Sequence, residues 1–272
     1  MAERIEEKEI VDPPQMIRRL EGRLAGRRIV EGPWVEPSPR RVRVYFNGVA
    51  VADSRNVLLA FEPKRLPVYW FPQADVSAGY LWPAGHTGST PSRAARFDVV
   101  VGERRAEKAA WTYPDPGPGL EALKDHVAFY WKEMDSWYEE DDEVYVHPRD
   151  PYHRVDVLRS SRHVRVEIGG QVVAESSRPC LLFETGLPTR YYLPKPDVRM
   201  DLMEPSRTTS QCPYKGIAVY WTMRDGPRDI LWGYPFPIPE CPKIENMLSF
   251  YNEKVDITVD GELQARPVTI WS

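Results

Sequence analysis

The sequence predicts a mainly β protein (α+β only in a minor part) made of two tandem domains, each of antiparallel strands followed by one C-terminal helix. Short runs of alternating apolar and polar residues, broken by Pro and Gly, are typical of antiparallel sheets and not of parallel α/β units. The pattern occurs twice at whole-domain length, which indicates a tandem duplication and not a solenoid of roughly 20–50-residue units. With 272 residues, the chain is long enough for two separate cores.

Residues 1–31 are rich in charged side chains and carry one helical pattern over 16–24. We expect this segment to form an N-terminal arm that packs on a domain. Its arginines fit a solvated helix face better than a polyanion-binding surface.

Residues 32–138 form the first repeat, which begins with a hairpin. Residues 42–54 alternate apolar and polar side chains around Asn47-Gly48, a dipeptide that strongly favours a two-residue hairpin turn. Further short strands, separated by prolines and glycines, are predicted over 57–76.

Residues 155–272 form the second repeat, and an acidic and then proline-containing stretch, residues 139–154, links it to the first. The second repeat superposes on the first without a gap over most of its length. Matched pairs include Val42 with Val164, Gly48 with Gly170, Phe61-Glu62 with Phe183-Glu184, Asp75 with Asp197 and, after a one-residue deletion, Trp111-Thr112-Tyr113-Pro114 with Trp232-Gly233-Tyr234-Pro235.

One helix is predicted near the end of each repeat. Residues 120–131 and 244–251 place apolar side chains at positions i, i+3, i+4 and i+7. A single helix on a β-rich layer suits a domain of about 110 residues.

Composition argues against nucleic acid and membranes as partners, and a small-molecule ligand is the expected partner. A net charge of −4 gives no global attraction to nucleic acid or to an anionic membrane, so neither is expected. No apolar run reaches the roughly 20 residues that cross a bilayer, and residues 1–8 lack the apolar core of a signal peptide, so a soluble cytoplasmic protein is expected. Cys180, Cys212 and Cys241 form no Cys-x-x-Cys pair and are expected as free thiols, without a metal or another cofactor. The oligomeric state stays open.

The chemical differences between the repeats concentrate in residues 208–216, Thr-Thr-Ser-Gln-Cys-Pro-Tyr-Lys-Gly. The first repeat keeps the turn but not these side chains, so we interpret it as a degenerate structural or lid-forming copy beside a working second repeat. The pairs that differ are Cys212 against Thr90, Tyr214 against Ser92, Lys215 against Arg93, Arg178 against Asn56 and Arg190 against Val68.

The second repeat resembles domain-of-unknown-function family 427, which also carries a nucleotidyltransferase-like name. The resemblance rests on strands over 164–198, on Cys212-Pro213-Tyr214-Lys215-Gly216 and on the motif Trp-Gly-Tyr-Pro over 232–235; the first repeat matches in its strands. It implies a compact β fold similar to the β-tent of methionine-sulfoxide-reductase-B-like proteins. The chain lacks the paired Cys-x-x-Cys zinc ligands of many of those proteins and the Gly-Ser plus Asp-x-Asp constellation that metal-dependent nucleotidyl transfer needs.

Three residues form the expected catalytic set. Cys212 lies three residues before Lys215, and a nearby ammonium raises the thiolate fraction of a thiol, which favours a nucleophilic or acid/base role. The competing interpretation is a small buried side chain that only packs. Lys215 can pair with a substrate anion or with Glu184, or lie solvated in the turn. Glu184 recurs as Glu62, which favours a structural role, but it can serve as general acid or base if it is buried.

The remaining candidates are expected to bind substrate. The guanidinium groups of Arg178 and Arg190 suit carboxylate or phosphate recognition, with surface salt bridges as the alternative. His147 and His153 in the linker lack a third ligand for a metal. The linker is expected to bring two side chains to the site, and aromatic walls complete it: the set is His153, Arg154, Tyr191, Tyr214 and Tyr234.

The sequence therefore leads to an enzyme of unassigned reaction, acting on a small, anionic metabolite in a pocket of the second repeat. A non-catalytic ligand-binding or sensor protein is the second hypothesis. A nucleotide-binding protein, as the family name suggests, is the third.

Overall fold

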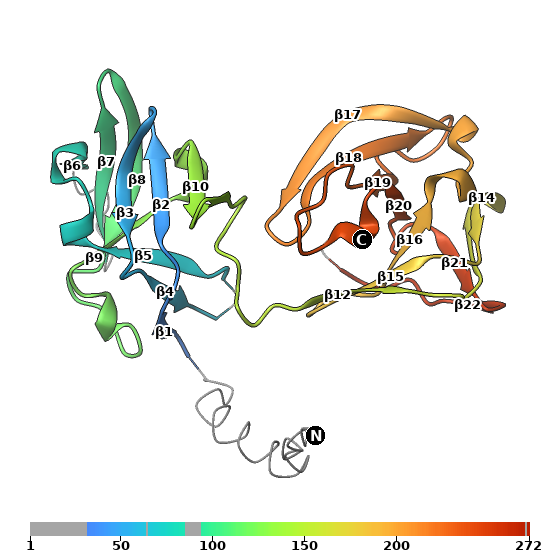
Figure 1. The fold of residues 1–272 in the computed structure, drawn as a ribbon, viewed down its shortest axis with the longest axis horizontal. Coiled ribbons are helices and arrows are strands. Elements are labelled where there is room, and N and C mark those ends of the chain that lie inside the picture. The colour runs from blue at the N-terminus through green and yellow to red at the C-terminus, as the bar shows by residue number, and fades with distance from the viewer. Residues whose placement is uncertain (1–31, 64, 85–93, 270) are drawn as a thin grey trace, which may run out of the picture.

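The computed structural model describes residues 32–63, 65–84, 94–269 and 271–272. Two β-rich lobes, blue to green and yellow to red in Figure 1, are joined by an extended segment. The predicted N-terminal arm, residues 1–31, lies outside the described residues. In the part that the structure describes, no helix is both long and apolar enough to cross a membrane.

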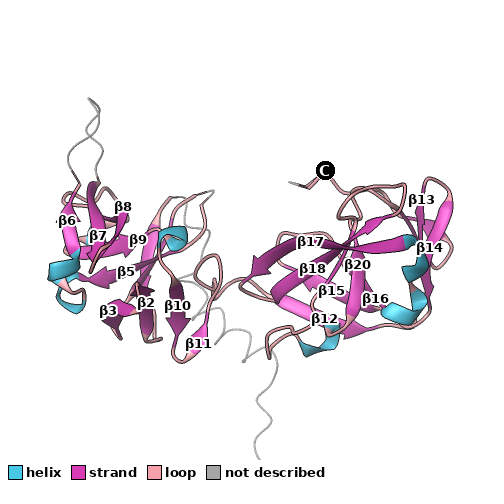
Figure 2. Ribbon diagram, turned by 90° about the horizontal axis from the view of Figure 1, so that it is seen from above, coloured by secondary structure: helices cyan, strands magenta, loops and turns pink. Residues whose placement is uncertain are grey.

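Antiparallel strands account for most of the regular structure in both lobes, and the helical turns are only three residues long (Figure 2). The first lobe contains β1 (Trp34–Pro37), β2 (Val42–Phe46), β3 (Val49–Ser54), β4 (Leu58–Phe61), β5 (Val68–Pro72), β6 (Leu81–Pro83), β7 (Ala95–Val101), β8 (Arg104–Thr112), β9 (His126–Phe129), β10 (Ser136–Glu139) and β11 (Asp142–Glu143).

The second lobe contains β12 (Val155–Arg159), β13 (Val164–Ile168), β14 (Gln171–Ser176), β15 (Cys180–Glu184), β16 (Arg190–Pro194), β17 (Met203–Cys212), β18 (Gly216–Met223), β19 (Leu231–Gly233), β20 (Met247–Phe250), β21 (Asp256–Val259) and β22 (Glu262–Leu263). The three-residue 3-10 turns are η2 (Gln73–Asp75), η3 (Ala78–Tyr80), η4 (Glu121–Leu123), η5 (Trp131–Glu133), η6 (Lys195–Asp197), η7 (Met200–Leu202) and η8 (Pro242–Ile244).

Each lobe pairs a seven-stranded sheet with a four-stranded sheet. The first lobe has the orders β1-β4-β5-β9-β8-β7-β6 and β11-β10-β2-β3. The second lobe has the orders β12-β15-β16-β20-β19-β18-β17 and β22-β21-β13-β14. Each strand of the second lobe therefore has the same neighbours as its counterpart in the first lobe. The predicted mainly β fold in two tandem copies is therefore confirmed.

The predicted hairpin at the start of the first repeat is present. Asn47 and Gly48 connect β2 to β3 with positive φ angles of 49° and 74°. Gly169 and Gly170 connect β13 to β14 with φ angles of 58° and 81°. Two consecutive left-handed residues match the twist of the flanking strands, which is why Asn-Gly and Gly-Gly occupy these turns.

Each large sheet is covered on both faces. In β16, Tyr191 and Leu193 pack into the core between the two sheets, whereas Tyr192 packs into a second apolar cluster. In β5, Tyr69 and Trp70 divide in the same way. Because successive side chains of a strand point to opposite faces, a strand buried on both sides is apolar throughout.

The predicted helix at the end of each repeat is wrong. Residues 120–131 form the turn η4 and the strand β9, and residues 244–251 contain the end of η8 and the strand β20. Asp125 and Asn246 have φ angles of 60° and 56°, which end the turn before an α-helix can propagate. The apolar spacing has another cause: a buried residue of the turn is followed by a strand that is buried on both faces.

The linker contacts both lobes. The Tyr152 hydroxyl lies 2.5 Å from Glu36 Oε2, and its ring packs near Phe61 in the first lobe. On the other side, the Asp150 backbone N–H donates to the Tyr214 hydroxyl at 2.9 Å. Asp150 and Tyr152 are only two residues apart, but Asp150 contacts the second lobe and Tyr152 contacts the first.

Candidate functional site

Lys215 points inward from the turn between β17 and β18. Its backbone N–H donates to the Cys212 carbonyl at 3.3 Å, which closes the turn. Gly216 follows with a φ of 104°, and a Cβ at that position would lie 3.2 Å from the Phe236 carbonyl oxygen. The Lys215 ammonium lies 2.5 Å from Glu184 Oε2, and the two side chains are only 10% and 6% exposed. The turn therefore places a buried charge pair against the end of β15.

His153 extends this pair into a chain of polar groups. Its Nε2 lies 2.9 Å from Glu184 Oε1, so the carboxylate has one cation-bearing partner and one imidazole partner. The His153 ring stacks on Tyr214 with 4.2 Å between ring centroids. Burial raises the pKa of Tyr214 to about 12, although the N–H of Asp150 lowers it. Tyr214 is therefore a neutral phenol at physiological pH.

The thiols lie beside this network in an apolar environment. Cys212 is half-buried at the end of β17 and packs against an apolar cluster that includes Tyr192, Tyr234 and Cys241. Burial raises the pKa of Cys241 to about 11, although Lys215 lowers it. Burial also raises the pKa of Cys180. All three are free cysteines, as the spacing predicts.

A cavity of about 260 Å³ lies at the junction of the linker, the first lobe and the second lobe. Arg149 spans it and forms an ion pair with Glu240 at 2.7 Å. The Nε atom of Arg149 is buried and has no hydrogen-bond partner among the described residues. The lining comprises Arg40, Arg149, Asp150, Pro151, His153, Val155, Tyr214, Ile238, Glu240 and Cys241.

The structure thus brings Lys215, Glu184, His153 and Tyr214 together, with Cys212 and Tyr234 in the adjoining apolar cluster. Arg178 is not part of this group. It is exposed and forms an ion pair with Asp197 at 2.9 Å. Arg154 is 79% exposed in its side chain and pairs with Asp156. Tyr191 faces the core between the sheets, away from the cluster that holds Cys212.

Arg190 is also separate from the Lys215 network. Its guanidinium donates to both carboxylate oxygens of Glu253, at 2.7 Å and 2.6 Å, and lies within 5.6 Å of the centroids of Trp232 and Trp271. Burial opposes ionisation of Glu253, but hydrogen bonds from Arg190 and Thr269 lower its pKa to about 2. Arg190 is therefore a fully paired charge inside the second lobe.

Sequence reasoning missed Arg149, Asp150 and Cys241, which line the cavity, and Tyr192, which packs in the apolar cluster beside Cys212. Strand alternation distinguishes Tyr192 from Tyr191 once β16 is assigned, because only alternate residues of a strand share a face. The three others come from the linker and the loop after β19, where no period indicates direction. These three residues can be recognised only from the three-dimensional structure, in which they line the junction cavity.

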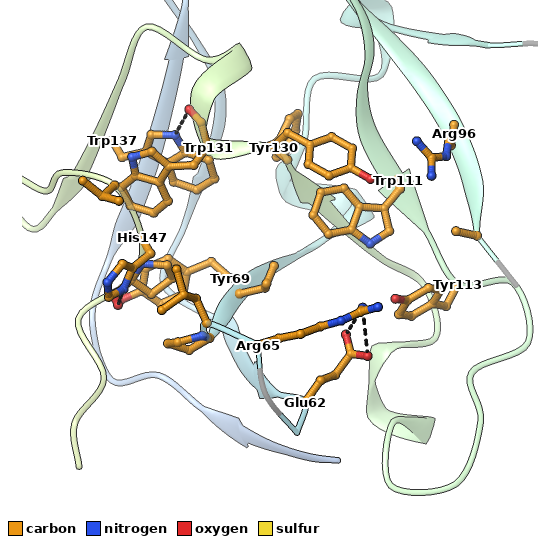
Figure 3. A pocket seen from close by; sticks show the side chains of 17 residues that line it. Glu62, Arg65, Tyr69, Arg96, Trp111, Tyr113, Tyr130, Trp131, Trp137 and His147 are labelled. Atoms are coloured by element: carbon orange, nitrogen blue, oxygen red, sulfur yellow. Dashed lines mark hydrogen bonds and ion pairs between the residues drawn. The ribbon is translucent and has the colours of Figure 1, made fainter. Parts of the chain in front are cut away.

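A larger cavity, of about 400 Å³, lies in the first lobe and is lined by side chains of the first repeat and by linker residues 146–148. Figure 3 shows Trp131 and Trp137 on one side and Trp111 and Tyr130 on the other. The ion pair between Glu62 and Arg65 lies at its base, with 3.2 Å between the nearest N and O atoms (Figure 3). Glu62 is the counterpart of Glu184, so the two repeats differ in what surrounds the same carboxylate.

Across the described ranges, which omit 1–31, 64, 85–93 and 270, no group of three or more His, Cys, Asp or Glu side chains is arranged to hold a metal ion. A family model described as a domain of unknown function, DUF427, matches residues 34–140 and, a second time, residues 156–261. No curated protein matches the chain.

Proposed function

Because the chain belongs to the DUF427 family, in two tandem copies, we propose its function from the site itself: it is an enzyme that acts on a small anionic metabolite at the junction cavity. In this proposal His153 transfers the proton, Glu184 orients His153, and Arg149 attracts the anion. The observation that carries the proposal is the buried series Lys215–Glu184–His153, which ends at the cavity.

The energetics of the series argue for a role beyond folding. Desolvating two charges opposes their mutual attraction, so a buried ion pair is often no more stabilising than apolar side chains of the same volume. Lys215 and Glu184 are nevertheless buried together with a histidine on the second carboxylate oxygen. Their retention is explained if the carboxylate fixes the imidazole for chemistry.

The arrangement gives the histidine a defined tautomer. When Nε2 carries the proton that is donated to Glu184, Nδ1 becomes the basic nitrogen. A carboxylate that orients an imidazole in this way is a common basis of general acid–base catalysis. The stacked Tyr214 ring restricts rotation of the imidazole.

The ligand class follows from charge and size. The guanidinium groups of Arg40 and Arg149 line the cavity. Guanidinium donors suit carboxylates and phosphates. A cavity of about 260 Å³ admits a metabolite smaller than a typical drug molecule.

Cys212 is the second candidate for the reacting group of the proposed enzyme, after His153. Its half-buried side chain adjoins the network, whereas Cys241, which lines the cavity, has its pKa raised to about 11 and stays a thiol at neutral pH. We place the reaction in the cytoplasm, a proposal supported by the three free cysteines, because reducing compartments keep thiols unpaired.

A non-catalytic ligand-binding protein is the alternative, and one observation favours it. The Lys215 ammonium is already neutralised by Glu184 and is therefore not free to activate a thiol or to clamp a substrate. In that case the network only shapes the cavity.

The test is a panel of small carboxylates, phosphates and nucleotides with magnesium, screened for thermal stabilisation and then for conversion by mass spectrometry. We expect a stabilising compound to be converted by the wild type, and His153→Gln to bind it but to lose about 100-fold or more in rate. The glutamine amide replaces the Nε2–H bond to Glu184, so the fold is preserved.

Arg149→Ala is expected to weaken binding about tenfold, and Arg178→Ala, outside the cavity, to change neither quantity. Unchanged conversion by His153→Gln would refute the assignment of His153 as the proton-transferring group. Binding without conversion by the wild type would establish the alternative, and no stabilisation by any compound would contradict both.

A further inference from the structure

We propose that the first repeat contains a second, separate binding site, for a planar aromatic molecule that carries an acidic group. The site is the cavity of about 400 Å³ shown in Figure 3. The proposal does not depend on the chemistry assigned to the second repeat. It also gives the first repeat a role other than that of a degenerate copy.

Aromatic rings form two walls of this cavity. Trp131 and Trp137 stack in parallel at 4.2 Å between centroids with an interplanar angle of 8°. Trp111 and Tyr130 lie on the opposite side, 4.3 Å apart and inclined by 34° (Figure 3). Stacking on such side chains recognises any flat π-system. The walls therefore select for a planar ligand.

The charges at the rim favour an acid over an amine. Arg65 and Arg96 both line the cavity, against the single carboxylate of Glu62. Arg65 already binds Glu62, whereas the Arg96 guanidinium lies over the Tyr130 ring at 6.0 Å from its centroid. Burial lowers the pKa of His147, so this lining residue stays neutral at physiological pH. The excess positive charge suits a carboxylate or a phosphate.

The second repeat acts as an internal comparison, because it fills the equivalent place with its own side chains. Arg190, the counterpart of Val68, lies over Trp232, the counterpart of Trp111, and binds Glu253. The first repeat has Val68 at the cavity wall in place of this guanidinium.

Other differences between the repeats make the surroundings of the cavity in the first repeat more positive than the equivalent region of the second repeat. Glu253 corresponds to Lys132, so the carboxylate that holds Arg190 has no acidic counterpart in the first repeat. Arg65 corresponds to Leu187 in the sequence. Arg96 takes the place of Tyr220, because Arg96 pairs with Trp111 as Tyr220 pairs with Trp232, so both arginines are present only in the first repeat. In the second repeat the aromatic wall therefore carries the paired cation Arg190, whereas in the first repeat Val68 takes that position and Arg65 and Arg96 line the cavity.

Calorimetric titration of the full chain tests the proposal with four probes. Indole-3-acetate and AMP combine a planar ring with a carboxylate and a phosphate, respectively. Tryptamine has the ring and a cation, and acetate has the acid without the ring. We expect indole-3-acetate, AMP or both to bind, tryptamine to bind about tenfold more weakly, and acetate not to bind. Preference between the first two identifies the acidic group.

Two variants assign the binding to this cavity. Tyr130 is 38% exposed, so Tyr130→Ala removes part of a wall without emptying the core, and it should weaken binding about tenfold or more. Arg96→Ala should weaken the acidic probes about tenfold and leave tryptamine unchanged. Arg224→Ala, an exposed arginine of the second lobe that pairs with Glu204, is the matched control and should change nothing.

Equal affinity for tryptamine and indole-3-acetate would overturn the proposal, because the cavity would then not distinguish a cationic ligand from an anionic one. Unchanged affinity in both Tyr130→Ala and Arg96→Ala would place the binding elsewhere. Failure of both ring-bearing acids to saturate at millimolar concentration would show that the cavity is not a site for this class.

Discussion

The ammonium of Lys215 and the carboxylate of Glu184 lie 2.5 Å apart, and each side chain is at least nine-tenths buried. The pair joins the turn after β17 to the end of β15, two segments that are distant in the sequence. Burial makes this pair unlike the exposed ion pairs on the surface of either lobe.

Removing one partner of the buried pair should be strongly destabilising. We expect Lys215→Met to lower the free energy of unfolding by about 3–5 kcal/mol, because it leaves the Glu184 carboxylate buried with only His153 as a partner. Urea unfolding of the full chain measures the change.

The double variant Lys215→Met with Glu184→Leu should recover most of that loss, since no buried charge remains. Arg178→Ala breaks an exposed pair and serves as the control, with a much smaller expected change in the free energy of unfolding. Equal losses for the buried and the exposed pair would show that burial does not determine the effect.

The three thiols should react at different rates. Cys212 is half-buried, whereas Cys180 and Cys241 are buried with raised pKa values. We expect iodoacetamide at pH 8 to alkylate Cys212 first, because reactivity follows the exposed thiolate. Peptide mass spectrometry over a time course measures the order. Alkylation of Cys241 as fast as that of Cys212 would contradict the buried position of Cys241.

Acid should remove the stabilisation that Glu253 provides. Its pKa falls from 4.5 to about 2 in the folded protein, so the contribution is complete above pH 4.5 and disappears as the pH falls toward 2. The shift corresponds to about 3 kcal/mol. The difference in unfolding free energy between wild type and Glu253→Gln should therefore be large at pH 6 and close to zero at pH 2.

The exposed pair of Arg199 and Asp201 provides the comparison for this measurement. Asp201→Asn should leave the free energy of unfolding nearly unchanged at any pH between about 2 and 6. A difference for Glu253→Gln that does not vary with pH would exclude the ionised carboxylate as its source.

Gly233 should not accept a side chain. A Cβ at this position would lie 2.6 Å from the Met247 carbonyl oxygen, which belongs to the paired strand β20 and cannot move freely. We expect Gly233→Ala to destabilise the chain by about 2–3 kcal/mol. Gly79→Ala meets nothing within 4 Å and should stay within about 0.5 kcal/mol of the wild type in thermal and urea unfolding.

The strands were predictable because their signals are local. The turn at Asn47-Gly48 and the alternation around it define a hairpin without reference to the rest of the chain. Because the two repeats match in sequence, the strands assigned in the first repeat could also be assigned in the second. The helix predicted over 120–131 failed because sheet pairing on both sides of β9 buries consecutive residues, and this burial imitates a helical period over a short segment.

The candidate site was only partly predictable. Comparison of the repeats identified Lys215, and Glu184 was among its possible partners. The same comparison selected Arg178 and Arg190, whose charges are taken up by Asp197 and Glu253 within the second lobe. A residue that differs between two copies marks a changed interaction, but the sequence does not show whether the new partner is a ligand or a neighbouring side chain.

The linker makes the two copies depend on each other, because residues of both lobes hold it. Within a few residues it donates to Tyr214 in one copy and contacts Glu36 and Phe61 in the other. Deletion of either copy would therefore remove hydrogen-bonding and packing partners from the segment that remains. A substitution at Tyr214 in one lobe or at Glu36 in the other would therefore remove a hydrogen bond from the same short segment.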